Sequence, residues 1–171
     1  MNDTAVPPPS IVFEVSGHRL ALPSGMIVRV LPLPRLDRLP ASPPVIAGLF
    51  RYGGALVPVL HLDRLLGLAA GRPGLYRPLL LCRRGGGMVA YLCDRVIGLA
   101  TPGDLSPLPR PDGAAPLSFN RCVTARFEHE GAMSLMLDPS RLLTAAEDQS
   151  LDAHRRIAEE RAAAWAKGDE P

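Results

Sequence analysis

Short apolar segments separated by turns that contain glycine or proline run through most of this 171-residue chain. The pair Glu130-Gly131 and the triplet Arg84-Gly85-Gly86 each stand between two apolar runs, where they predict β-hairpins. Strands that follow one another at such close intervals are typical of a small barrel or sandwich. The chain is long enough to bury one core, or the cores of two small interleaved units. The sequence therefore predicts an all-β body.

The predicted strands share a short apolar or alternating run that ends at a turn signal. They are Ile11–Ser16, Arg19–Pro23, Met26–Leu33, Ala55–Leu62, Pro78–Arg83, Gly87–Asp94, Arg95–Leu99, Arg121–Glu130 and Ala132–Asp138. Met26–Leu33 is either extended throughout or begins with a helical turn. Pro58 lacks the N–H that a β-ladder needs, so we expect its strand to lie at a sheet edge or at a bulge. One helical turn is predicted for Asp63–Leu68.

The tail of the chain has a helical pattern. Thr144 and Glu147 have the spacing of a capping box, and apolar residues recur at helical spacing from Leu151 to Trp165. Residues 144–171 carry seven acidic and four basic side chains, so we predict an acidic amphipathic helix. We expect it to pack on the β body or to remain solvated, rather than to form a dedicated docking site. The predicted divisions are a disordered lead-in (1–10), a β domain (11–143) and this helix.

The chain lacks the signals of a membrane or secreted protein. No apolar run reaches the roughly 18 residues that a membrane span needs, and the N-terminus has no basic region followed by an apolar one. Three cysteines, Cys82, Cys93 and Cys122, lie among apolar residues without CxxC spacing, and we interpret them as small core residues. A Cys82–Cys93 bridge requires that their strands pair. The predicted location is cytoplasmic, without membrane insertion.

A catalytic constellation is not visible. No GxSxG elbow occurs, and the glycines at 85–87 lack the Lys-Ser/Thr ending of a phosphate loop, so we interpret them as a solvated hairpin tip. His61 and Asp63 form a His–carboxylate pair two residues apart. On a strand they would share a face, which is compatible with metal binding, but we favour a solvated rim. The predicted protein is not an enzyme and holds no metal or cofactor.

Single-stranded nucleic acid is the alternative ligand for a small β-barrel. Such sites combine a basic groove with aromatic stacking platforms. Here the net charge is only +2, the aromatic residues are scattered singly, and Phe50-Arg51-Tyr52 is the only mixed triplet. The sequence therefore supports nucleic-acid binding only weakly.

Several segments resemble the CheW-like family of chemosensory coupling proteins. They are Pro44-x-Ile46-x-Gly48-Leu49, the Gly54 turn, Val57-Pro58-Val59-Leu60-x-Leu62, Leu65-Leu66-Gly67, Tyr91-Leu92-x-Asp94-Arg95-Val96-Ile97-Gly98, and Leu135-x-Leu137-Asp138-Pro139-Ser140-Arg141-Leu142-Leu143. Their order and spacing agree with the family pattern, and IVFEVSGHRLALP fits its opening hairpin. The resemblance spans Ile11 to Leu143.

The resemblance implies two intertwined, five-stranded, SH3-like β-barrels with an apolar groove between them. It also implies a non-enzymatic scaffold, monomeric within a larger array, that joins the regulatory domain of a CheA-type histidine kinase to the hairpin tip of methyl-accepting chemoreceptors. The residues that the resemblance assigns to partner binding are Ile27, Arg29, Ile46, Gly48, Leu49, Arg51, Tyr52, Gly53, Gly54, Pro58, Val59 and Asp94.

Two positions depart from the family pattern. The family has arginine immediately before the turn glycine, where this chain has Gly53, and glutamate where this chain has Arg29. Both positions are tied to receptor contact in the family, so the changes indicate either altered partner choice or drift at a solvated surface. If the segment is extended, Arg51 projects from the same face as position 53 and substitutes for the missing cation. We expect an alternative, non-flagellar chemosensory pathway.

Overall fold

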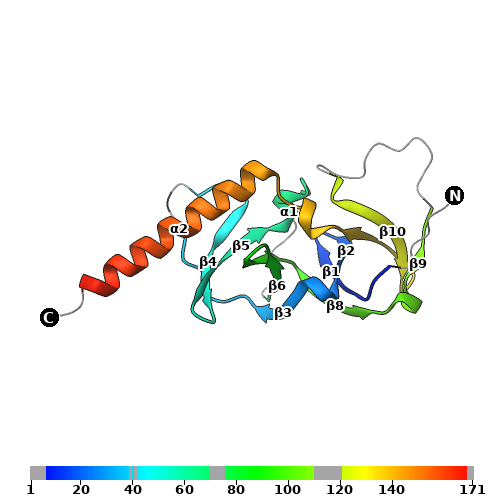
Figure 1. The fold of residues 1–171 in the computed structure, drawn as a ribbon. Coiled ribbons are helices and arrows are strands. Elements are labelled where there is room, and N and C mark those ends of the chain that lie inside the picture. The colour runs from blue at the N-terminus through cyan, green and yellow to red at the C-terminus, as the bar shows by residue number, and fades with distance from the viewer. Residues whose placement is uncertain (1–6, 39, 41, 70–75, 110–120, 169–171) are drawn as a thin grey trace.

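The computed structural model describes residues 7–38, 40, 42–69, 76–109 and 121–168, and it consists of two β-sheets and one long C-terminal helix (Figure 1). Sheet A contains β1 (Ser10–Val15), β2 (His18–Pro23), β8 (Arg95–Ala100), β9 (Ser106–Pro107), β10 (Val123–His129) and β11 (Ala132–Leu137). Sheet B contains β3 (Ile27–Pro32), β4 (Ile46–Tyr52), β5 (Ala55–His61), β6 (Pro78–Arg84) and β7 (Gly87–Leu92). The helices are α1 (Leu62–Leu65) and α2 (Ala145–Gly168).

The chain begins in sheet A, crosses to build sheet B, and returns to finish sheet A. The strand orders are β8-β1-β2-β11-β10-β9 and β3-β6-β7-β5-β4. Within the described residues the terminal strands of neither sheet pair with each other, so neither sheet closes by hydrogen bonding. The predicted intertwined all-β fold is confirmed, with six and five strands in place of five and five. The sixth strand is the two-residue β9, which pairs with β10 at Phe127 and Glu128.

The main core lies between the two sheets. Its buried members include Phe13, Leu20 and Leu22 from sheet A, and Leu60, Leu80 and Tyr91 from sheet B. Further apolar clusters cover the other faces: Val57, Val59, Leu79, Leu81, Ala90 and Leu92 for sheet B, and Val12, Ala21, Phe127 and Met136 for sheet A. The alternation of side chains along each strand divides these clusters, because successive residues point to opposite faces.

Pro58 does not lie at a sheet edge, and that part of the prediction is wrong. β5 is an inner strand between β7 and β4, and Pro58 is paired in register with Leu49. The His61 N–H donates to Val45 on the β4 side, so Pro58, three residues earlier, turns its nitrogen toward β7. The β5–β7 ladder begins only at Val59, so the missing donor interrupts no ladder bond. The register irregularity lies on the partner strand, between Ile46 and Gly48.

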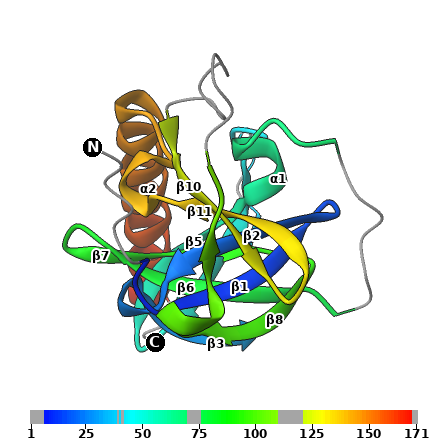
Figure 2. The same ribbon diagram turned by 90° about the vertical axis from the view of Figure 1, so that its right-hand side faces the viewer.

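Helix α2 begins at the predicted capping box, which is confirmed. The Thr144 N–H donates to Glu147 Oε2 at 2.8 Å, and the Glu147 N–H donates to Thr144 Oγ1 at 3.2 Å. Figure 2, viewed from the sheet A end, shows α2 along one side of the molecule. At the other end of the chain, β1 begins at Ser10, which is fully buried although it belongs to the predicted lead-in; residues 1–6 lie outside the described part.

The three cysteines are buried, as predicted for core residues. Cys82 in β6 is paired in register with Val89, and Cys93 follows the end of β7, so the two thiols do not form a bridge. Burial raises the pKa of each of these two thiols to about 12. Both are therefore protonated at neutral pH.

Candidate functional site

The residues that the resemblance assigns to partner binding lie almost entirely on sheet B, at its two opposite edges. Ile27 and Arg29 are on the edge strand β3, whereas most of the others are on β4, β5 and the turn between them. The exposed members are Arg29, Arg51, Gly53 and Gly54; the half-buried members are Ile27, Ile46, Tyr52 and Asp94; the buried members are Gly48, Leu49, Pro58 and Val59. The structure therefore divides them between two surfaces and a supporting layer.

The first surface is the turn of the β4–β5 hairpin. Gly53 and Gly54 have φ values of +56° and +85°, and positive φ at both central residues is what a type I′ hairpin turn requires. Phe50 and Tyr52 support the turn with an edge-to-face ring pair at 6.4 Å. Because the chain is extended only to Tyr52, the expectation that Arg51 and position 53 share one strand face is wrong.

Gly48 allows the preceding loop to pack closely against β4 of this hairpin. The preceding loop forms an isolated bridge with β4, in which the N–H groups of Asp37 and Leu49 each donate to the other's carbonyl at 2.8 Å. A Cβ at position 48 would lie 2.8 Å from the Leu36 Cβ and 2.9 Å from the Asp37 carbonyl oxygen. The loop can approach the strand only because residue 48 is glycine, and it covers an edge that would otherwise be open.

The second surface is the edge strand β3. Its outer side has no paired strand among the described residues. Arg29 is exposed there, and apolar side chains around it are 36–43% exposed: Met26, Val28, Val30 and Leu33. An apolar strip with one central cation, on a strand that can accept a neighbour, is suited to an extended or helical partner.

Asp94 lies between β7 and β8, where the chain crosses from sheet B to sheet A. Its carboxylate is 3.0 Å from Arg77 and accepts the Ser16 N–H at 2.6 Å. Its own N–H donates to the Glu14 carbonyl at 2.8 Å. The carboxylate is thus occupied by groups of this chain and links the two sheets.

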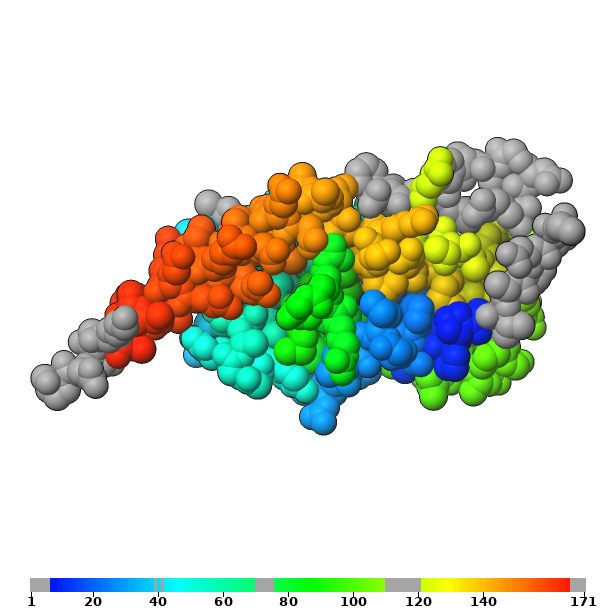
Figure 3. Space-filling view, in the orientation of Figure 1, coloured from blue at the N-terminus to red at the C-terminus, as the bar shows by residue number. Residues whose placement is uncertain are grey.

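Helix α2 covers the outer face of the β4–β5 hairpin. Ala158 packs against Leu49 and Leu56, which are only 3% and 8% exposed. Figure 3 shows the helix lying across these strands and across the β6–β7 hairpin, with its C-terminal end extending past the body. Leu151 enters the main core, and Trp165 is 82% exposed. Of the two residues expected to pack on the body, Leu151 does and Trp165 does not, while Ala158 packs in addition.

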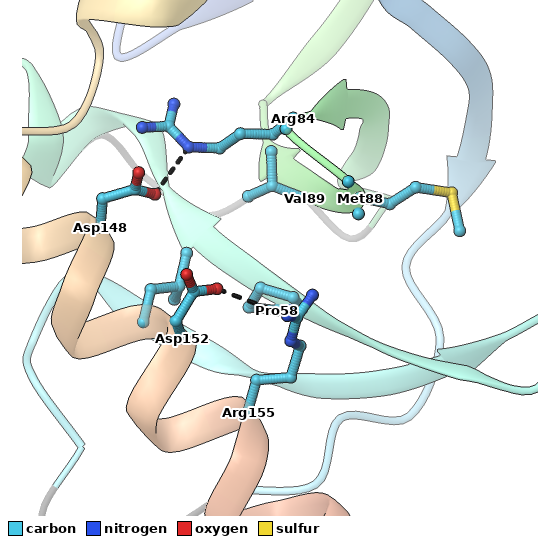
Figure 4. A pocket seen from close by; sticks show the side chains of 11 residues that line it. Pro58, Arg84, Met88, Val89, Asp148, Asp152 and Arg155 are labelled. Carbon is cyan, nitrogen blue, oxygen red and sulfur yellow. Dashed lines mark hydrogen bonds and ion pairs between the residues drawn. The ribbon is translucent and has the colours of Figure 1, made fainter.

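A cavity of about 250 Å³ lies between α2, Pro58 and the β6–β7 hairpin (Figure 4). Arg84 reaches across it and pairs with Asp148 on α2 at 2.8 Å. Arg155 lies close to Gly87, where a Cβ would be 2.7 Å from its Nη1. The glycine-rich tip is therefore partly a seat for α2 rather than a purely solvated turn. The residues that carry this contact in the sequence are Arg84 and Asp148, but nothing local indicates that they pair, because the fold alone brings them together.

His61 and Asp63 do not share a strand face, because β5 ends at His61 and Asp63 lies in α1. Their nearest side-chain atoms, Nδ1 and Oδ1, are 3.8 Å apart. Burial and the neighbouring Arg64 lower the pKa of His61 from 6.5. No third potential metal ligand joins them among the described residues.

The aromatic rings do not form a stacking platform in the described part of the chain. Phe13, Phe50, Tyr91 and Phe127 are buried, whereas Tyr76 and Trp165 are strongly exposed but lie on separate segments. Phe119 lies outside the described residues. None of the helices in the described ranges is long and apolar enough to cross a membrane.

Three comparisons relate the chain to known proteins. A family model described as the CheW-like domain matches residues 9–147. The chain is similar to Protein FrzA of Myxococcus xanthus, with 33% identity over 101 residues; the match covers 59% of this chain and 63%, less than two thirds, of that protein. It is also similar in structure to the scaffolding protein TtCheW from Thermoanaerobacter tengcongensis, with a TM-score of 0.69 and 16% identity over 85% of this chain and 93% of that one. At this identity the structural similarity shows the fold alone.

Proposed function

The chain belongs to the CheW-like domain family, and from this membership we propose that it is a scaffold that couples chemoreceptors to a CheA-type histidine kinase. The family match over residues 9–147 is the observation that carries the proposal. In this role the protein acts through binding surfaces and catalyses no reaction. It works in the cytoplasm as a monomer, next to membrane-bound receptors that it reaches through its partners.

The β3 edge is the proposed receptor contact. Its exposed apolar side chains supply contact area, and Arg29 supplies a charge that selects a partner of opposite sign. Arg29 stands where the family has glutamate, so we infer that the receptor tip of this pathway carries an acidic group at the facing position. This reversed charge, together with Gly53, supports assignment to an alternative, non-flagellar chemosensory pathway.

The β4–β5 hairpin is the proposed kinase contact. On this hairpin Arg51 is exposed, while Leu49, Pro58 and Val59 form the supporting layer. The Gly53-Gly54 turn at its end, where the family has its receptor-contacting arginine, is assigned to the receptor together with β3. A hairpin held by aromatic packing and a covered edge presents a rigid surface, which reduces the entropy lost on binding.

The test measures binding of two purified partners, a kinase regulatory domain and a receptor cytoplasmic hairpin fragment, by biolayer interferometry. We expect the wild-type protein to bind both. Arg29→Glu should weaken the receptor complex by about tenfold, corresponding to about 1.4 kcal/mol, and leave kinase binding unchanged. Arg156→Glu, an equal charge reversal on the exposed face of α2, is the matched control.

Leu49→Asp should abolish kinase binding, and circular dichroism must show that this variant folds, because Leu49 is buried. The scaffold proposal requires both complexes, so it would be overturned if the wild-type protein failed to bind the kinase domain or failed to bind the receptor fragment. Steeply salt-dependent binding of single-stranded nucleic acid would support the alternative function instead.

A further inference from the structure

Helix α2 is attached to the body unevenly along its length. Its first turns are fixed by the capping box, by the Arg84–Asp148 pair and by Leu151 in the main core. Beyond Leu151 the buried residue in contact with the body is Ala158. Residues 159–166 are exposed apart from the half-buried Ala162, and this end of the helix extends past the sheets (Figures 1 and 3).

The contact at Ala158 nevertheless hides an apolar patch. Leu49 and Leu56 lie on adjacent strands, on the same face of the hairpin, and with Ala158 they form a separate cluster. Ala158 is the buried helix residue of this cluster, so the cover that α2 gives to the two leucines includes its side chain. Exposing both leucines on helix release would leave an apolar patch next to the exposed Arg51.

The cavity flanks α2 between Asp148 and Arg155, in the turns that also carry the Arg84–Asp148 ion pair and Leu151. The cavity of about 250 Å³ separates α2 from Pro58 and the β6–β7 hairpin, so the atoms that line it lack the close contacts of a packed interior. Arg155 lines this cavity, yet its ion pair is with Asp152 on the same helix, at 3.6 Å. Among the described residues, no ion pair joins α2 to the body beyond Asp148.

We propose that α2 beyond Leu151 is a displaceable cover over Leu49 and Leu56, and that the kinase regulatory domain must displace it to dock on this patch. The inference rests on the proposed function and adds regulation to it. The patch is continuous with the exposed Arg51, which is paired in register with Leu56, so the kinase domain can contact both. The free protein is then the covered state, and partner affinity is reduced by the small fraction of molecules that are uncovered.

Two variants uncover the patch by different means. Truncation after Arg156 removes Ala158 but retains Asp148 and Leu151. Ala158→Glu places a carboxylate against Leu49 and Leu56, where it cannot remain buried. Ala153→Glu is the matched control, because it makes the same substitution at an exposed position of the same helix.

Isothermal titration with the kinase regulatory domain measures the effect on the dissociation constant. If about one molecule in ten is uncovered, both variants should bind about tenfold more tightly, with the control at the wild-type value. Hydrogen exchange in residues 156–166 of the wild type should become faster when the kinase domain binds.

The other possible results distinguish a failure of the helix-cover proposal from a failure of the scaffold function. Equal dissociation constants for all four proteins would overturn the cover and leave the scaffold function intact. Weaker binding by both uncovering variants would show that α2 is part of the interface, which also overturns it. If none of the four proteins binds, the proposed function itself fails.

Discussion

The carboxylate of Asp94 accepts a 2.6 Å hydrogen bond from the backbone N–H of Ser16, in the turn between β1 and β2. Ser16 has a φ of +50°, a conformation that non-glycine residues rarely adopt, so the carboxylate helps to hold a strained turn. Arg77 completes the arrangement at 3.0 Å. A residue that family resemblance assigns to partner contact thus fixes the crossing between the two sheets.

Asp94→Asn should lower the free energy of unfolding by about 1–3 kcal/mol, because it removes the charged acceptor of the Ser16 N–H and leaves Arg77 without its counter-ion. Urea denaturation measures the change. The control is Glu14→Gln, which breaks the more exposed pair with Arg95 and should cost about 0–1 kcal/mol. Unchanged stability combined with lost partner binding would show that Asp94 is itself a contact residue.

Gly48→Ala should destabilise the protein by about 1–3 kcal/mol, because the added methyl group would overlap Leu36 and the Asp37 carbonyl. Thermal denaturation is the measurement. Gly98→Ala, also in a strand, meets nothing within 4 Å and should change stability by less than about 0.5 kcal/mol. Equal melting temperatures for the two variants would mean that the loop at Asp37 moves aside without loss.

Gly53→Arg restores the family's cation at the hairpin turn, and it should alter receptor binding more than kinase binding. It also forces a φ of +56° on a residue with a side chain, which should cost about 1–2 kcal/mol of stability. Gly53→Asn is the control for the backbone effect, because asparagine tolerates this region and adds no charge. Equal effects on both partners would show that the receptor and kinase surfaces are wrongly assigned.

The protein should lose stability as the pH rises above about 9. Burial raises the pKa of Cys82 and of Cys93 from 9.0 to about 12, so over this range the unfolded chain loses thiol protons that the folded chain retains. The loss continues until the folded-state pKa values are reached. Urea denaturation at about pH 8 and about pH 10 measures it.

The Cys82→Ala/Cys93→Ala double variant is the control and should show a smaller decline. A decline of the same size in that variant would assign the alkaline sensitivity to other groups, such as Tyr91, whose pKa is also raised by burial.

Local sequence predicted nine of the eleven described strands, because alternation and turn residues act within a few positions of the chain; β4 and β9 were not among the predicted strands. The predicted Arg19–Pro23 and Ala132–Asp138 differ from β2 and β11 by a single residue at one end. The position of Pro58 could not be predicted in the same way. Whether its strand is an edge depends on the parallel pairing with β7, which is formed by residues far along the chain.

The candidate site was predictable as a set of positions but not as a surface. Leu49 and Val59 both appear as apolar residues in strands, yet Leu49 faces α2 and Val59 faces the cluster behind sheet B. Alternation shows that neighbouring residues lie on opposite faces, and it does not reveal what covers each face. Similarly, no local pattern links Arg84 to Asp148, which are joined only when the helix docks.

The order in which sheet A is assembled has a consequence for synthesis on the ribosome. Leu20 in β2 pairs in parallel with Leu135 in β11, so all of sheet B is translated between the two halves of this ladder. At about 5–20 residues per second, the β1–β2 hairpin waits on the order of ten seconds for that neighbour. During this interval the hairpin exposes an unpaired apolar edge, to which a chaperone or a neighbouring nascent chain can bind.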